Sequence, residues 1–232
     1  MIFEQLFDSK SSTYTYIVSS GKGREALIID PVIENTNEYI KVLKNLDLQL
    51  VKVIDTHIHA DHISGLNELS KRTSCSKIMG EKSGSEVLDI RVKDNEKIKI
   101  ENIELISMYT PGHTDCSYSF LMKDRVFTGD TLLINATGRT DFQSGSSYDA
   151  YDSLFNKLLK LPQKTLVYPA HDYNGKKYST IENEKNKNPR LQVSSAEEYA
   201  EIMDNLNLAN PKMMDVAVPA NIKGLTLNQL NK

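Results

Sequence analysis

The five histidines of this 232-residue chain gather in three short segments. They are His57, His59 and His62 in the run Thr-His-Ile-His-Ala-Asp-His, His113 in Pro-Gly-His, and His171 in Pro-Ala-His. Carboxylates accompany them, since Asp61 lies inside the first run and Asp130 ends a Thr-Gly-Asp segment. Imidazole nitrogens and carboxylate oxygens are ligands for divalent zinc, iron and manganese. A single histidine is more often an ordinary core or surface residue, but this grouping predicts a metal centre.

The elements that must position these residues are strands. The apolar pattern predicts strands over residues 50–54, 125–128 and 166–168, and a hairpin over residues 98–109. Each histidine segment follows one of these elements, and Asp130 lies at the end of another. Loops at strand ends are where α/β folds build their sites. We therefore expect the metal centre to form at strand ends.

The remaining pattern predicts a mixed α/β domain. Further strands are expected over residues 13–18, 25–30 and 118–122. Helices are expected over residues 37–46, 63–71 and 148–161, with another beginning at Ser195, where a Ser-Ala-Glu-Glu sequence forms a capping box. The polar run of residues 182–188 is interpreted as a solvated helix.

Composition excludes several classes of protein. The chain carries 28 Lys plus Arg against 31 Asp plus Glu, a net charge of −3, which argues against a general nucleic-acid binder. Two cysteines, Cys75 and Cys116, are too few for a disulfide scaffold. No apolar run approaches the ~20 residues of a membrane span, and the first residues lack a signal-peptide pattern. We expect a cytoplasmic protein with no nucleic-acid or membrane partner.

Four segments carry a family resemblance. Residues 56–62, 111–113, 128–130 and 169–171 resemble the metallo-β-lactamase superfamily. The resemblance implies a four-layer αββα sandwich, formed by residues 1–232 as a single domain with a short C-terminal extension. It also implies a metal site at one edge of the two sheets. The superfamily includes hydrolases and oxidoreductases, so the reaction stays open at this level.

Other segments are more selective. Residues 138–143, 170–175, 179–181, 188–191 and 217–221 are similar to the persulfide dioxygenase family, and the similarity runs from residue 6 to about residue 221. The resemblance implies one catalytic Fe(II) ion per chain, held by His57, His113 and Asp130. It implies that glutathione persulfide reacts with O2 and water to give sulfite and glutathione. Homodimers are frequent in this family, so we expect one here.

The resemblance assigns roles to further residues. His59, Asp61, His62 and His171 become an outer shell or a second site without metal. Arg139 and Arg190 become ligands for the glutathione carboxylates, together with Tyr173, because arginine binds a carboxylate as a planar fork. Asp141 and Asp172 become outer-shell acceptors. Two alternatives stay open: a buried ion pair between Asp141 and Arg139, and a surface role for Arg190 in capping carbonyls.

Two other functions fit the same residues. In a glyoxalase II-like hydrolase, one zinc ion binds His57, His59 and His113, a second binds Asp61, His62 and His171, and Asp130 bridges them. A shared hydroxide then attacks a thioester. That family usually has aromatic residues after its Gly-Arg pair, where this chain has Thr140 and Asp141, and a longer C-terminal domain. A non-catalytic metal-binding protein is the third hypothesis.

Cys116 lies three residues after a predicted metal ligand. Two interpretations stay open for its thiol. We favour a small buried hydrophobic residue, and the alternative is a redox-sensitive thiol beside the metal.

Overall fold

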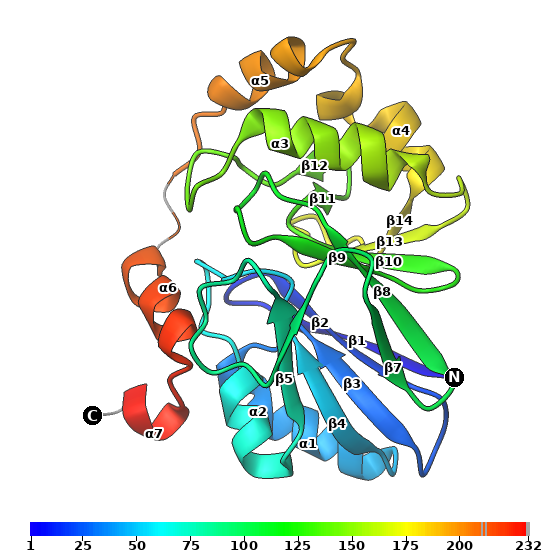
Figure 1. Ribbon diagram of the computed structural model, residues 1–232, viewed down its shortest axis with the longest axis vertical. Helices are drawn as coiled ribbons and strands as arrows, with labels where there is room; N and C mark the ends of the chain where they lie inside the picture. The colour runs from blue at the N-terminus through cyan, green and yellow to red at the C-terminus, as the bar shows by residue number, and fades with distance from the viewer. Residues whose placement is uncertain (210, 212, 231–232) are drawn as a thin grey trace.

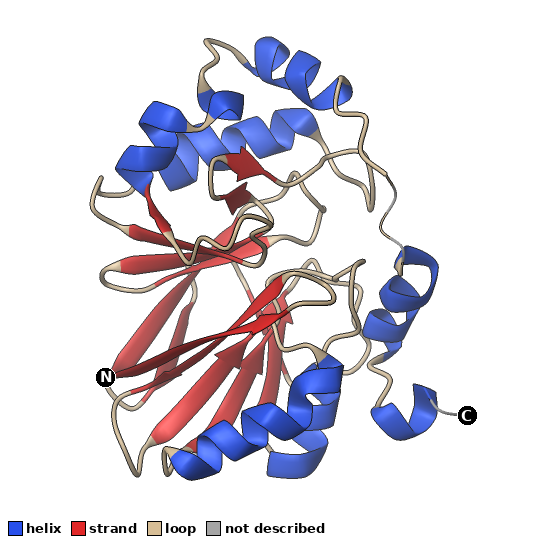
Figure 2. Ribbon diagram, turned by 180° about the vertical axis from the view of Figure 1, so that it is seen from behind, coloured by secondary structure: helices blue, strands red, loops and turns tan. Residues whose placement is uncertain are grey.

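Two sheets face each other, and helices cover both outer faces (Figures 1 and 2). The computed structural model describes residues 1–209, 211 and 213–230. Each sheet has six strands. The predicted four-layer αββα sandwich is therefore confirmed.

The N-terminal sheet has the strand order β1-β2-β3-β4-β5-β6. Its strands are β1 (Ile2–Asp8), β2 (Thr13–Ser19), β3 (Glu25–Ile29), β4 (Gln49–Ile54), β5 (Ser76–Gly80) and β6 (Ile90–Val92). The first three are antiparallel neighbours, and β3 to β6 run parallel. Every residue of β2 is buried, as expected for a strand covered on both faces.

The C-terminal sheet has the strand order β14-β13-β10-β9-β8-β7. Its strands are β7 (Lys97–Ile100), β8 (Ile103–Tyr109), β9 (Tyr118–Leu121), β10 (Arg125–Gly129), β13 (Leu166–Pro169) and β14 (Ser179–Thr180). Only β10 and β13 pair in parallel. A small hairpin of β11 (Leu132–Leu133) and β12 (Ala136–Thr137) follows β10.

Five of the α-helices form two outer layers, and the last two helices lead the chain back toward the N-terminal sheet. Helices α1 (Thr36–Asn45) and α2 (Leu66–Thr73) cover the N-terminal sheet, while α3 (Ser147–Asp152), α4 (Ile181–Lys187) and α5 (Ala196–Asp204) cover the other (Figure 1). Helix α3 continues through a π-type segment, Ser153–Lys157, and a 3-10 turn, Leu158–Lys160. The chain then returns to the N-terminal half as α6 (Met214–Lys223) and α7 (Leu227–Leu230). No helix among the described residues is long and apolar enough to cross a membrane.

An apolar core between the sheets holds the sandwich together. Tyr16, Phe120 and Phe127 are almost fully buried there, and the Tyr16 and Phe127 rings lie 5.0 Å apart. Burying aromatic side chains of this size removes a large apolar area from water. The Tyr16 hydroxyl donates to the carbonyl of Pro169, so even its polar atom is paired inside the core. This bond ties β2 to the end of β13.

Most predicted elements are confirmed within a few residues, while six strands and two α-helices were missed. The missed strands are β1, β5, β6 and the two-residue strands β11, β12 and β14, and the missed helices are α6 and α7. The residues of β1 are mostly half-buried, and β6 is a three-residue edge strand, so neither carries a strong pattern. Helix α2 begins three residues later than expected, because residues 55–65 form the loop of the histidine run. Ser195 does cap α5, where its side chain accepts from the amide of Glu198.

The expectation of a solvated helix over residues 182–188 was wrong at two positions, Glu184 and Asn188, which are buried. Glu184 of α4 is fully buried. Its carboxylate accepts from the backbone amide of Asn135 at 2.8 Å and from Asn188 Nδ2 at 2.9 Å, and it also accepts from Ser179 and Asn183. Glu184 therefore joins α4 to the loop between β11 and β12 and to β14.

Replacing Glu184 with alanine leaves these donors without an acceptor. We expect Glu184→Ala to lower the free energy of unfolding by about 3 kcal/mol, since each unsatisfied buried polar group costs about 1–3 kcal/mol. Urea unfolding followed by circular dichroism measures the change. Glu182→Ala on the exposed face of the same helix is the matched control, with a change within about 0.5 kcal/mol. Equal effects for the two variants would contradict the structural role of Glu184.

Candidate metal centre

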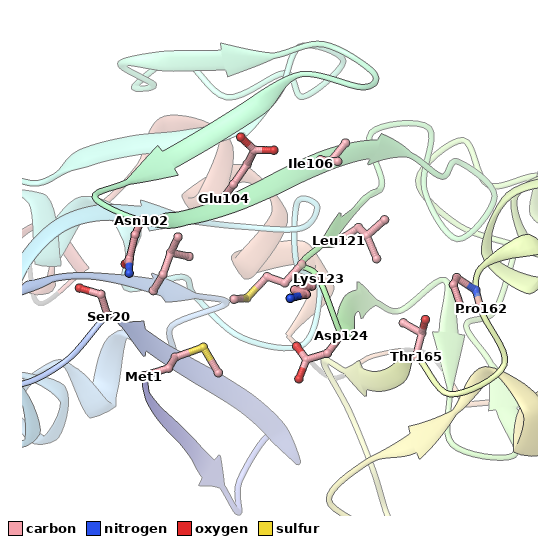
Figure 3. Close-up of a pocket in the computed structure, with 12 residues that line it drawn as sticks. Met1, Ser20, Asn102, Glu104, Ile106, Leu121, Lys123, Asp124, Pro162 and Thr165 are labelled. Atoms are coloured by element: carbon pink, nitrogen blue, oxygen red, sulfur yellow. The ribbon is translucent and has the colours of Figure 1, made fainter.

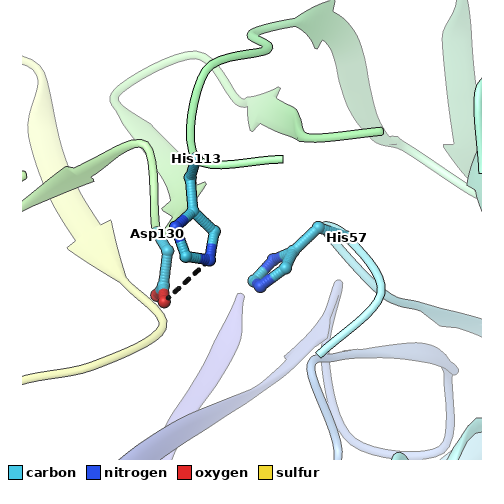
Figure 4. A group of neighbouring side chains, drawn as sticks. All are labelled: His57, His113 and Asp130. Atoms are coloured by element: carbon cyan, nitrogen blue, oxygen red, sulfur yellow. Dashed lines mark ion pairs between the residues drawn. The ribbon is translucent and has the colours of Figure 1, made fainter. Parts of the chain in front are cut away.

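Four strand ends deliver the predicted residues to one place. His57 follows β4, His113 follows β8, Asp130 follows β10 and His171 follows β13. One ligand atom each from His57, His113 and Asp130 lies within 4.8 Å of the others (Figure 4). His113 Nε2 is 3.6 Å from Asp130 Oδ2. The predicted triad is thus a compact group of side chains from both sheets.

The His57 ring is oriented by two polar residues. The Thr56 hydroxyl donates to Asp30 Oδ2 at 3.0 Å and lies 3.0 Å from His57 Nδ1. Because the hydroxyl has one proton, it accepts from His57 Nδ1–H. The backbone amide of Thr56 also donates to Asp30, at 2.7 Å. This arrangement leaves His57 Nε2 with a lone pair, as a metal ligand requires.

The His113 ring is oriented by a backbone carbonyl. Its Nδ1 donates to the carbonyl oxygen of Arg139 at 2.8 Å, which leaves Nε2 facing Asp130. Gly138 allows this close approach. A Cβ atom there would lie 2.1 Å from the Asp130 carbonyl and 2.9 Å from His113 Nδ1. No residue larger than glycine fits without moving one of the candidate ligands.

The second predicted group lies beside the first. His59, Asp61 and His62 each offer a ligand atom within 4.8 Å of the others. His171 Nε2 lies 3.4 Å from Asp61 Oδ2 and 3.7 Å from Asp130 Oδ1. Asp130 therefore lies between the two groups. The structure brings all seven predicted ligand residues into one cluster.

Three buried atoms in this cluster have no hydrogen-bond partner among the described residues. They are His59 Nδ1, His62 Nε2 and Asp130 Oδ1. Leaving a buried polar atom unpaired is costly, so such atoms call for an explanation. All three carry lone pairs suited to a divalent cation. The donor set thus fits a metal ion.

The charges of the cluster favour metal binding as well. Burial, helped by the neighbouring His59 and His113, holds the pKa of His57 well below its usual value, so the ring is neutral near pH 7. Burial raises the pKa of Asp130, but His171, His113 and His57 outweigh it and lower the value. Burial also opposes charge on His171, yet Asp130 and Asp61 raise its pKa to about 10. Asp61 and Asp130 are thus ionised, and a cation bound between them would compete with the proton that they favour on His171.

A pocket of about 430 Å³ opens onto the cluster. Its walls include His113, Asp130 and His171 together with all three predicted substrate ligands, Arg139, Tyr173 and Arg190. Leu133 and Leu208 contribute apolar surface. A small organic molecule in this pocket would reach the candidate ligands directly.

Comparisons with known proteins agree with this geometry. The model of the metallo-beta-lactamase superfamily matches residues 9–171. The mitochondrial persulfide dioxygenase ETHE1 of Mus musculus is 41% identical over 96% of this chain and 88% of its own length. The crystal structure of ETHE1 from Myxococcus xanthus has a TM-score of 0.93, with 46% identity over 96% of this chain and 98% of that chain. The chain belongs to the persulfide dioxygenase family.

The family assignment favours the dioxygenase among the predicted functions. A hydroxyacylglutathione hydrolase of Dictyostelium discoideum is more distant, at 31% identity over 77% of this chain and 69% of that protein. The predicted resemblance to the persulfide dioxygenase family is therefore confirmed and preferred over glyoxalase II. As a member of that family the chain is an enzyme, and the non-catalytic hypothesis is not supported.

A second pocket, larger than the one at the candidate metal centre, lies elsewhere on the chain. It has a volume of about 880 Å³ and is lined by residues that include Met1, Glu104, Leu121 and Pro162 (Figure 3). None of the candidate metal ligands lines it. We therefore assign the chemistry to the smaller pocket at the strand ends.

Asp141 forms a two-pronged ion pair with Arg139, with both N–O distances 2.7 Å. The Asp141 side chain is half exposed, so the alternative of a buried pair was wrong in that respect. The Arg139 guanidinium also donates to the carbonyls of Ala209 and Leu208. Among the described residues, Asp141 makes no hydrogen bond to a candidate ligand.

Asp172 shapes the loop that carries Tyr173. Its carboxylate is buried and accepts from the backbone amides of Asn174 and Lys176 at 2.8 and 2.7 Å. Tyr173 itself is 73% exposed, and its ring lies parallel to that of His171 at 6.1 Å. Asp172 therefore acts on the rim of the pocket.

Several residues of this site were missed by the sequence analysis. Asp30 is the most important, since it accepts from Thr56 and lies 3.2 Å from His59 Nε2. Burial raises its pKa to about 6, against the bonds from Thr56, so it is a carboxylate at neutral pH. The rule that identified Asp130 also applies to Asp30, because both stand directly after a strand. Gln143 and Asn221 lie in two segments that carry the family resemblance, residues 138–143 and 217–221, but neither follows a strand directly.

Cys116 is buried beside the histidine run. The backbone amide of Ile58 lies 3.5 Å from its sulfur, and burial raises the pKa of the thiol. A raised pKa disfavours the reactive thiolate. The geometry therefore favours the interpretation as a small buried residue over a redox-sensitive thiol.

Removing one candidate ligand tests the centre. We expect His113→Ala to lower bound iron per chain by more than about ten-fold, because even lesser changes around metal ligands cost ten-fold in affinity. Elemental analysis after iron loading and desalting measures the loss. Asp115→Asn, an exposed carboxylate two residues away, is the control that should keep its iron. Full iron in His113→Ala would remove this residue from the centre.

Proposed function

We propose that this chain is an iron-dependent persulfide dioxygenase that converts glutathione persulfide, O2 and water to sulfite and glutathione. The observation that carries the proposal is the compact group of His57, His113 and Asp130 in a chain of the persulfide dioxygenase family. Atoms balance, since the terminal sulfur takes two oxygen atoms from O2 and one from water, and the thiol of glutathione is released.

His57, His113 and Asp130 would hold one Fe(II) ion. Two histidines and one carboxylate form a facial set that leaves positions open for other ligands. When bound, the iron supplies the redox chemistry that lets a sulfur ligand react with O2. The protein residues supply orientation: Thr56 fixes the His57 ring, and the Arg139 carbonyl fixes the His113 ring.

His59, Asp61, His62 and His171 would act as an outer shell around this ion. His171 donates through Nδ1 to the Ser12 carbonyl at 3.0 Å, which points Nε2 toward Asp130 and Asp61. Residues in this position hold the carboxylate ligand in place and tune the metal. In this proposal, one iron ion per chain is sufficient.

Arg190 would bind a carboxylate of the glutathione part. It lines the pocket, and among the described residues its guanidinium donates only to Thr137. Its remaining N–H groups are available to a ligand. Arg139 differs, because Asp141, Ala209 and Leu208 already accept from its guanidinium. We therefore assign substrate binding to Arg190 first, with Tyr173 on the rim.

One observation favours the two-zinc hydrolase as a second candidate. The unpaired atoms His59 Nδ1 and His62 Nε2 belong to the residues that such an enzyme would use for its metals. Both functions thus need an experiment that separates them.

Oxygen uptake separates the two candidates. Protein loaded with iron should consume O2 when given glutathione persulfide, and sulfite should accumulate in equal amount. An oxygen electrode and a sulfite assay measure the two rates, with the His113→Ala variant as the inactive control. Absence of oxygen uptake, together with rapid lactoylglutathione hydrolysis by the zinc-loaded protein, would establish the hydrolase instead.

Arg190→Ala tests substrate binding. We expect the apparent KM for glutathione persulfide to rise about ten-fold with kcat little changed, because the variant loses a charge-assisted bond made in both the ground and transition states. Steady-state oxygen uptake gives both constants. Arg72→Ala, which removes an arginine paired with Glu68 on α2, is the control. An unchanged KM would reject the role of Arg190.

A further inference from the structure

Helix α6, near the C-terminus, carries Asn221, whose side chain contacts the backbone of the histidine run at residues 57–62. Asn221 is 8% exposed. Its Oδ1 accepts from the backbone amide of Ser64 at 2.8 Å, and its Nδ2 donates to the carbonyls of His59 and His62 at 2.9 and 3.0 Å. One side-chain amide therefore contacts the backbone at three points within six residues.

These contacts satisfy backbone groups that have no other partner. Among the described residues, no other hydrogen bond reaches the carbonyl oxygens of His59 and His62. Between β4 and α2 the chain forms neither helix nor strand, so regular structure does not fix its path. Backbone bonds hold its two ends, where Tyr118 N–H donates to the Thr56 carbonyl and Ile33 N–H to the Ile63 carbonyl. Among the described residues none of these bonds reaches residues 57–62, so side-chain bonds must fix that part. The Asn221 amide is one of these bonds.

A second amide holds the same run from another direction. Gln143 Nε2 donates to the carbonyl of Ile58 at 2.8 Å. The carbonyls of Ile58, His59 and His62 are thus each held by a side-chain amide from a segment distant in sequence. Both amides act on the backbone that follows the proposed ligand His57 and carries the outer-shell residues His59 and His62.

Helix α6 is anchored independently of the Asn221 amide. Ala217 and Ala220 are buried in an apolar cluster with Ile33 and Ile63. In addition, Asn67 Nδ2 of α2 donates to the carbonyl of Gly224, the residue that ends α6. The matched superfamily segment ends at residue 171, so this helix lies outside it.

We propose that Asn221 is a positioning residue for the metal centre: its amide fixes the backbone that aims His59 and His62. The proposal rests on the metal centre proposed above, and it does not depend on the identity of the substrate. In this proposal, the C-terminal extension supports the metal centre and belongs to the same domain.

Metal retention tests the proposal without any substrate. Iron-loaded protein is mixed with an Fe(II) chelator, and the rate of iron release is followed by absorbance. We expect release from Asn221→Ala to be ~10-fold faster or more, the usual cost of losing an outer-shell contact. The absorption bands of the Co(II)-substituted variant should also differ from those of the wild type, because the run that carries the ligand His57 and the outer-shell residues His59 and His62 loses two of its bonds.

Two further variants make the test specific. Asn221→Asp keeps the shape and the acceptor for Ser64 but loses both donated bonds, so we expect it to release iron as fast as Asn221→Ala. Asn67→Ala breaks a different tie of α6 and should keep the wild-type release rate and cobalt spectrum. Should Asn221→Ala fail to fold, Asn221→Asp decides alone.

Two results would overturn the proposal. One is iron release within about two-fold of the wild type in the Asn221 variants. The other is equally fast release from Asn67→Ala, which would mean that loosening α6 is the cause. Failure of the dioxygenase assay with slow iron release in the wild type would instead reject the proposed function and leave this inference intact.

Discussion

Each imidazole of the centre is tied through one ring nitrogen, and the other nitrogen is thereby left to face the cluster. The tying partners are Thr56, Asp30, Asp61, the carbonyl of Arg139 and the carbonyl of Ser12. Five rings packed this closely, four of them buried, would otherwise be free to adopt either tautomer or to rotate. Because the partners come from β-strand ends and loops of both halves of the chain, the sandwich itself fixes the direction of every ligand.

Asp30 connects the largest number of these interactions. It accepts from the backbone and hydroxyl of Thr56, and it contacts His59 as well. The backbone at Asp30 is left-handed, with φ of 51°, a conformation in which aspartate is more tolerated than bulky residues. The residue before Pro31 thus turns the chain sharply while its carboxylate sets two rings. Asp30 therefore has an unfavourable backbone conformation and also orients two rings of the candidate metal centre.

The sequence was sufficient to predict that the candidate ligands lie together, because residue type and place in the chain coincide for them. Asp130 stands directly after β10, and His57 and His113 follow the ends of β4 and β8 by three and four residues. Their supports were harder to find, since Asn221 lies more than 150 residues from the carbonyls that it binds. Nothing local marks an asparagine in a helix as the partner of a distant loop. Similarly, the pairing of Arg139 was weighed from sequence, but its bonds to the segment at Ala209 required the folded chain.

The centre draws on nearly the whole length of the chain. Thr13 forms an isolated bridge with His171, and Tyr14 donates to the carbonyl of Ala170, so the first antiparallel strands contact residues that are synthesised much later. Such long-range contacts form late in folding. His57, His59, Asp61 and His62 come from the first half of the sandwich, and Asp130 and His171 come from the second. Neither half of the chain could therefore assemble the candidate centre alone.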